Sequence, residues 1–284
     1  MGLVYVGLAI VGWGVGDFLI QRSARKLGDW EALFFVTLFA TIVLFPFVYA
    51  ALSALSGFEW LVLSLTSVII LVAALFDFEA LRIGKISIIE PIYAMEVPIT
   101  IALSTLLIGE VMTSTQLALI AILLLGIVLV SNKSFGTMRI KSIERGVIAA
   151  VLATIGLGIS NFLFGFASRE TSPIMINWFT SAFMAVASIA YLLWVGEGKR
   201  TMRNLWKNKT LILSVGFVDN MAWVAYATSM LTLPIGFATG LSESYIALGA
   251  LLGVAINKER LSTHQVFGLI IALCAAVALA LTMT

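Results

Sequence analysis

Long runs of apolar residues, separated by short polar segments, alternate along the whole chain. Ten of them are about 20 residues long, the length that an α-helix needs to cross the hydrocarbon core of a bilayer. The runs occupy 2–22, 30–53, 60–82, 86–109, 114–132, 145–167, 173–196, 209–231, 236–257 and 262–282. The period-two alternation of a membrane β-barrel is absent. The pattern therefore predicts an all-α integral membrane protein with ten transmembrane helices.

The composition agrees with a lipid environment. Hydrophobic residues make up 61% of the 284 positions, charged residues 11%, and the mean hydropathy is +1.09. A water-soluble domain of this size has too small an interior for so many apolar side chains, so lipid must be the solvent for most of the chain. The first run carries Asp17 and is not followed by a small-residue cleavage site, so we expect a retained span and not a signal peptide.

The basic residues gather in alternate loops. Of the 17 Lys and Arg residues, all but Arg169 fall at or after the ends of the odd-numbered predicted spans. Positive charges in short loops stay in the cytoplasm. We therefore expect both termini to face outward, in the plasma (cytoplasmic) membrane of a prokaryote. The basic cluster after the seventh span is interpreted as a contact with anionic headgroups and not as a nucleic-acid site.

The chain contains an internal repeat. The segment 12–25, GWGVGDFLIQRSAR, matches the segment 156–169, GLGISNFLFGFASR, at a constant shift, with Asp17 replaced by Asn161. A second match joins the S/T-x-x-Q capping boxes at 113–116 and 262–265, which we expect to begin helices.

Each half of the chain holds five predicted spans. Because five is odd, the halves must cross the bilayer in opposite senses, which predicts two inverted five-helix repeats with a binding site at their interface. The expected boundaries are 1–132 for the first repeat, 133–144 for a cytoplasmic linker and 145–284 for the second repeat.

Three short motifs resemble one known family. They are the glycine-rich GWGVGDF at 12–18, the proline-bearing EPIYAMEVP at 90–98, and the GE at 109–110 that precedes a capped helix. Together with the two five-helix repeats they resemble the drug/metabolite transporter superfamily, EamA type. The resemblance covers nearly the whole chain and implies alternating-access movement of a small metabolite through a central cavity lined mainly by spans 1, 3, 4, 6, 8 and 9. Typical members keep both termini in the cytoplasm, whereas the charge bias here predicts the reverse.

Several carboxylates lie within or near the predicted spans, and no Lys or Arg lies well inside one. These acids are Asp17, Asp77, Glu79, Glu90, Glu96, Asp219 and Glu243. A charged Asp at the centre of a membrane helix costs about 2.5–3.5 kcal/mol on insertion scales. Such residues therefore face a wet cavity or a partner, and they are candidates for function.

Glu96 and Glu243 are the foremost candidates for binding solute or a coupling proton. Glu96 lies near the middle of the fourth span between Pro91 and Pro98, and Tyr93 shares its face. Proline removes an amide and kinks a helix, so we expect a broken helix that presents an acid and an aromatic ring to a central pocket. Glu243 lies at a comparable depth in the ninth span. The alternative for both is a neutral acid with a structural hydrogen bond.

Asp219 is followed by Trp223 and Tyr226 at one and two helical turns, and it is either a ligand for solute or a hydrogen-bond partner of a neighbouring helix. Asp17 recurs as Asn161, which favours a shared structural hydrogen bond at bends in spans 1 and 6 over a direct role in binding.

Asp77, Glu79 and Glu90 lie toward the cytoplasmic ends of their spans, where Arg82 and Lys85 can reach them. For Glu79 and Glu90 we expect interfacial ion pairs.

Acids without compensating bases make a negative pocket or one that holds protons. Aromatic side chains are expected around it: Trp13, Tyr93, Trp178, Trp223, Tyr226 and Tyr245. Such a pocket favours a cationic or amine-bearing solute through charge and cation–π attraction. The alternative for the aromatic residues is packing between helices.

These patterns predict a secondary active transporter for an amino acid, an amine or another cationic or zwitterionic solute, either proton-coupled or exchanging. The chain has no P-loop, and with one His (His264) and one Cys (Cys274) no metal, cofactor or catalytic constellation is expected. The expected partners are a small-molecule substrate, a coupling proton and the bilayer, without nucleic acid, in a monomer or dimer. A lipid flippase or scramblase on the same scaffold, and more remotely a membrane-embedded enzyme, are the alternatives.

Overall fold

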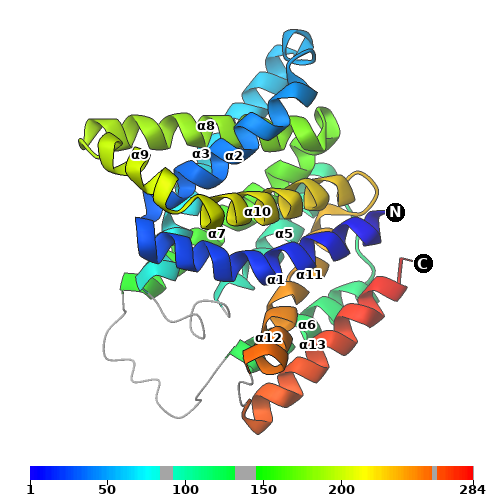
Figure 1. Cartoon of the computed structure of the whole chain (residues 1–284). Coiled ribbons are helices and arrows are strands. Elements are labelled where there is room, and N and C mark those ends of the chain that lie inside the picture. Colours follow the sequence, from blue (N-terminus) through cyan, green and yellow to red (C-terminus); the bar gives the residue numbers. More distant parts are fainter. Residues whose placement is uncertain (84–91, 132–144, 258–260, 284) are drawn as a thin grey trace.

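The computed structural model of the protein describes residues 1–83, 92–131, 145–257 and 261–283, without the side chains at 17, 81 and 253–257. In this part of the chain all regular structure is helical (Figure 1). The helices are α1 (Gly2–Leu27), α2 (Asp29–Val48), α3 (Gly57–Ile83), α5 (Glu96–Ile108), α6 (Ser114–Ser131), α7 (Arg145–Glu170), α8 (Pro173–Trp194), α9 (Gly198–Lys207), α10 (Lys209–Ser229), α11 (Ile235–Ser242), α12 (Ser244–Asn257) and α13 (Thr263–Leu281), with a short 3-10 turn η1 (Leu52–Ala54).

The expected all-α membrane fold is confirmed. Within the described residues, nine helical segments are long and apolar enough to cross a bilayer, and α5 is a shorter apolar helix. The pair α11 and α12 supplies one of the nine, Ile235–Leu252. The predicted fourth span, 86–109, is described only from residue 92 onward, and there the chain turns at 94–95 before α5 begins.

The helices pack in pairs that join the two halves of the chain. α1 packs against α10, α3 against α7, α2 against α8, and α6 against α13. Figure 1 shows α1 beside α10 and α6 beside α13. Exchanging the halves turns the pair α1–α10 into the pair α7–α3, and it leaves the pairs α2–α8 and α6–α13 unchanged. Each of these four pairs therefore contains one helix from each half of the chain.

The repeated glycines explain why two of these pairs come so close. A Cβ atom added to Gly12 on α1 would lie 2.6 Å from the Cβ atom of Ala222 on α10. The corresponding Gly156 on α7 meets Ala73 on α3, with 2.7 Å between the Cβ positions. Small residues let helix backbones approach in a membrane. The GWG and GLG motifs therefore serve helix packing in both halves.

The interface between α6 and α13 depends on Gly126. A Cβ atom there would lie 2.6 Å from the backbone nitrogen of Ala272 and 2.8 Å from the carbonyl oxygen of Gly268. We expect Gly126→Ala to lower the Tm of the purified protein in detergent, because overpacking typically costs about 1–3 kcal/mol. The matched control is Gly7→Ala on α1, where no heavy atom lies within 4 Å. Equal melting temperatures for the two variants would contradict this packing.

Two helices of the core are interrupted at a glutamate. α5 starts at Glu96, and α11 and α12 meet at Glu243, which is not helical itself. The sequence predicts the break before Glu96 but indicates none within the span 236–257. At this second break no proline is present; instead, the Ser242 hydroxyl donates to the carbonyl of Thr239 at 2.8 Å. Such side-chain bonds compete with the helical ladder and bend it.

The polar stretch between α8 and α10 contains the helix α9, where the sequence predicts a loop with a cluster of basic residues. α9 is amphipathic: Thr201 is buried, while Met202 and Trp206 are exposed beside several basic residues. Asn204 donates to the Glu31 carboxylate of α2 at 2.9 Å, which fixes the helix to the bundle.

Both capping boxes are confirmed. The backbone nitrogen of Thr113 donates to the side chain of Gln116 at 3.0 Å, and that of Ser262 donates to Gln265 at 3.0 Å. These residues therefore begin helices α6 and α13, as their pattern predicts.

Candidate functional site

A cavity of about 150 Å³ lies where the two halves meet. Residues of α1, α2, α3, α5, α7, α8, α10, α11 and α12 line it. On α3, α7 and α10 the lining residues lie from the middle of each helix onward, and on α2 and α8 they lie in the first half or at the middle; on α1, Trp13 and Ile20 lie on either side of the middle. The cavity therefore occupies the middle depth of the bundle and is shared by both halves.

Most candidates from the sequence lie on this wall. The acidic ones are Glu96, Asp219 and Glu243, and they are accompanied by Trp13, Tyr93, Asn161, Trp223 and Tyr226. Tyr245 lines the cavity as well.

Glu96 and Glu243 meet at the centre of the site. Each lies at the interruption of its helix, and their exposed fractions are 9% and 3%. The amide Nδ2 of Asn161 on α7 donates to Glu96 Oε1 at 2.8 Å, and the carboxyl group of Glu243 is within hydrogen-bonding contact of Glu96. Ionised carboxylates only accept hydrogen bonds. A bond between these two acids therefore contains a proton.

Asp219 on α10 is 6% exposed. The indole of Trp223, one turn later on the same helix, lies near its carboxylate and can donate to it. The Asp219 carboxylate therefore keeps unused acceptor capacity on the cavity side, because one indole N–H satisfies only part of it.

Asp77 on α3, one of the acids within or near the predicted spans, also lines the cavity. The sequence places it toward the cytoplasmic end of its span, together with Glu79. The hydroxyl of Tyr93 donates to the backbone carbonyl of Asp77 at 3.3 Å. Asp77 shares one face of α3 with Ile70 and Ala74, at helical spacing, and these two residues line the cavity too.

An aromatic cluster forms one wall. The ring centroid of Trp13 lies 5.2 Å from that of Trp223, 5.0 Å from that of Tyr226 and 6.1 Å from that of Tyr245, all in edge arrangements. A cation near the face of an aromatic ring is attracted by the quadrupole of the ring.

The charges around the cavity are one-sided. Four carboxyl groups line it, from Asp77, Glu96, Asp219 and Glu243, and no Lys or Arg is found among the lining residues that the structure describes. Burying an unpaired anion is costly. The wall therefore holds protons, a bound cation, or both.

Trp178 does not line the cavity. Its indole donates to the carbonyl of Thr41 on α2 at 3.1 Å, and its ring packs beside Phe45 and Phe179. Its aromatic side chain packs in the α2–α8 interface, which agrees with the alternative of packing between helices.

Three further acids were expected to have structural roles. The side chain of Asp17 and all of Glu90 lie outside the described residues. Glu79 pairs with Arg82 and, at 3.0 Å, with Arg145, so its expected interfacial ion pair is confirmed.

Uncharged polar groups that the sequence did not single out complete the wall. They are Thr37, Asn177, Thr180, Ser181, Asn220 and Ser242. Some are held by their own helix; Asn220, for example, donates to the carbonyls of Gly216 at 2.8 Å and Val36 at 3.1 Å. Among the described residues, no three His, Cys, Asp or Glu side chains gather in a metal-binding group.

Comparisons with known proteins bear on both halves. A family model described as "EamA-like transporter family" matches residues 1–132 and 144–281. A crystal structure of another protein superimposes on 100% of this chain and 96% of its own with a TM-score of 0.74, at 16% sequence identity, so the likeness shows the fold alone. No curated protein matches the chain in sequence.

Proposed function

Because the chain belongs to the EamA-like transporter family, a family of membrane transporters of the drug/metabolite type, we propose that it is a secondary active transporter for a small amine-bearing solute. The solute is cationic or zwitterionic, such as an amine or an amino acid, and it crosses by alternating access. The observation that carries this proposal is the one-sided charge of the cavity, with four carboxyl groups and no basic residue among its described lining.

The charge pattern selects the solute. An ammonium group placed between Asp219 and the Glu96–Glu243 pair gains charge-assisted hydrogen bonds that are stronger than neutral ones. Trp13 and its aromatic neighbours offer ring surface to the same cation. An anionic solute would face uncompensated repulsion in this low-dielectric site.

The volume limits solute size in this conformation. A cavity of about 150 Å³ has room for a molecule about the size of a benzene ring. A whole lipid does not fit, and the wall supplies no basic group for a phosphate. The dimensions thus favour a small metabolite over a lipid.

The Glu96–Glu243 contact supports proton coupling. The proton between the two carboxyl groups and the ammonium group of a solute compete for the same oxygens. Binding of the cation therefore favours release of the proton, and the two species exchange across the membrane. Carboxylates within membrane spans act in this way in proton relays.

The pairing of the halves supports alternating access. Because each repeat has five spans, the second repeat has the opposite orientation in the membrane to the first. The helix pairs are preserved when the two halves are exchanged, as expected for halves related by a two-fold axis in the membrane plane. Such halves have two equivalent arrangements around the central site, one open to each side. From the charge bias we place the ends with basic residues in the cytoplasm.

Reconstitution in liposomes tests this function. Purified protein is supplied with labelled amino acids, diamines and quaternary amines, with and without a pH gradient, beside protein-free liposomes. We expect gradient-driven accumulation of at least one cationic or zwitterionic solute and none of matched anionic solutes. Fluorescent-lipid translocation is measured in the same preparation. Lipid movement without solute uptake, or uptake of anions alone, would refute the proposal.

A further inference from the structure

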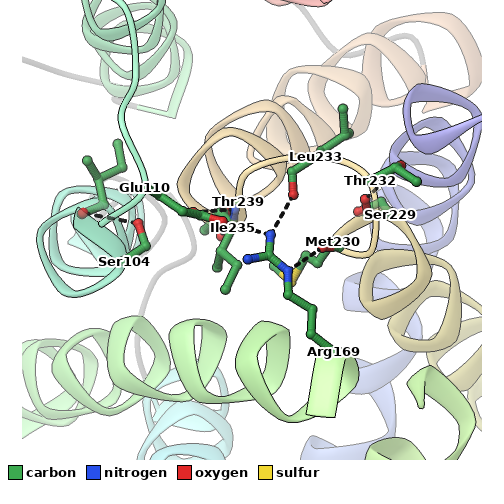
Figure 2. A network of polar contacts seen from close by, with 10 residues as sticks. Ser104, Glu110, Arg169, Ser229, Met230, Thr232, Leu233, Ile235 and Thr239 are labelled. Atoms are coloured by element: carbon green, nitrogen blue, oxygen red, sulfur yellow. Dashed lines mark hydrogen bonds and ion pairs between the residues drawn. The ribbon is translucent and has the colours of Figure 1, made fainter. Parts of the chain in front are cut away.

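Arg169, at the end of α7, is the exception to the pattern of basic residues in the loops. Its side chain has three polar partners among the residues that the structure describes. Its guanidinium pairs with Glu110 Oε1 at 2.7 Å. It also donates to the carbonyls of Met230 at 2.8 Å and Leu233 at 2.9 Å, in the connection between α10 and α11 (Figure 2). One side chain therefore joins three segments that are distant in sequence.

Glu110 has a second partner. Its Oε2 accepts the backbone N–H of Ile235, the first residue of α11, at 2.7 Å. The residue before it, Pro234, provides no side-chain cap. A carboxylate at a helix N-terminus satisfies a free amide and complements the helix dipole. Glu110 thus caps α11 and pairs with Arg169 at the same time.

This network is partly shielded from solvent. The side chain of Glu110 is 13% exposed and that of Arg169 is 31% exposed. Next to it, a Cβ atom on Gly165 would lie 2.7 Å from the side chain of Ile235 and 2.8 Å from the sulfur of Met230, so the helices are in close contact. Removing one partner of a shielded ion pair leaves the other charge uncompensated, which costs far more than loss of a surface pair.

A chain of polar contacts leads from this network to the cavity. The hydroxyl of Thr239 donates to the carbonyl of Ile235 at 2.9 Å and lies 2.7 Å from the hydroxyl of Tyr226, which lines the cavity. All eight residues of α11 are buried, and the helix ends directly before Glu243. One short helix therefore has the network at its first residue and the central acid at its end.

Resting on the proposed transport function, we propose that Arg169 and Glu110 form a latch that holds the N-terminus of α11 and closes the pathway at this end of the bundle. Opening toward this side requires α11 to leave its position, and it leaves when the latch releases. Because α11 ends at Glu243, a change in what Glu243 binds shifts the helix that the latch holds. Release of the latch and a change at Glu243 therefore shift the same helix, α11, between its closed and its open position.

Thiol labelling of the cavity tests the latch directly. The native Cys274 is replaced by Ala, and Ser181, which lines the cavity, is replaced by Cys. A membrane-impermeant thiol reagent is then applied to sealed vesicles from the side of Arg169. In Arg169→Gln and Glu110→Gln we expect labelling about tenfold faster or more, since loss of about 1.4 kcal/mol of closed-state stability shifts the equilibrium tenfold.

The matched control is Arg25→Gln, the repeat counterpart of Arg169, which is exposed at the other end of the bundle. It should label from the Arg169 side at the unmodified rate. Wild-type rates in both latch variants would overturn the proposal. If Arg169→Gln loses its melting transition, Glu110→Gln decides, because its amide still accepts the N–H of Ile235. Labelling needs no solute and no gradient, so a failed latch and a failed transport function are distinguishable.

Discussion

Replacing Glu96 or Glu243 with Gln abolishes solute accumulation driven by a pH gradient, down to the level of protein-free liposomes. This is the largest effect that we expect, because a glutamine amide keeps the size of the side chain but cannot bind and release a proton. The two carboxyl groups lie within hydrogen-bonding contact, and a hydrogen bond between two carboxyl groups requires a proton. If either carboxyl group is missing, the coupling proton is no longer bound at this site, so the cation cannot displace it.

The measurement is uptake of the solute found in the liposome panel, with the pH gradient imposed and collapsed. Glu197→Gln is the control, because Glu197 pairs with Arg200 at the surface at 3.2 Å with a side chain that is 40% exposed, and surface pairs contribute little. Wild-type accumulation in both Glu96→Gln and Glu243→Gln would rule out proton handling by this pair.

Asp219→Asn weakens binding of the cationic solute by about 10- to 100-fold, since a hydrogen bond to a charged group contributes about 1.5–3 kcal/mol. The asparagine has nearly the same size and shape and can still accept the indole N–H of Trp223, so we expect the local structure to be retained. What is lost is the charge that faces the cavity from α10.

The binding constant is measured by calorimetry or by protection against thermal unfolding in detergent. Asp219→Glu keeps the charge and is expected to retain more of the affinity than Asp219→Asn. If Asp219→Asn binds the solute as tightly as the unmodified protein, Asp219 is a structural hydrogen-bond partner, the alternative that the sequence left open.

The sequence predicted much of this architecture because the relevant signals are local or periodic. The apolar runs give the spans, and the shift between GWG at 12–14 and GLG at 156–158 relates the halves. Glu96 could be singled out because it is a charge near the middle of a span beside two prolines, and those features do not depend on any other part of the chain.

Other features depend on how distant segments meet, and the sequence could not supply them. Asp77 and Glu79 are two residues apart, yet Asp77 faces the cavity and Glu79 faces Arg82. Only the rotation of α3 against its neighbours separates them. The role of Trp178 could not be predicted for the same reason, because an aromatic residue in a span packs against a helix or lines a cavity according to the direction it faces.

The latch shows a third limit. Arg169 was recognised only as an exception to the loop-charge pattern, and Glu110 only as part of a GE motif before a helix cap. Two of the partners of Arg169 and one of Glu110 are backbone groups of residues 230–235. Backbone partners leave no mark in the side-chain sequence, so such a network emerges only when the helices are assembled.

The central claim is that a cationic solute and a proton exchange at one acidic site between the two halves, and solute-driven proton movement tests it most directly. Protein in liposomes with an entrapped pH indicator receives the solute from outside. We predict that the lumen changes pH with the wild-type protein and Glu197→Gln, and stays constant with Glu96→Gln combined with Glu243→Gln. Solute entry with no pH change in the wild type, or equal changes in the double variant, would contradict it.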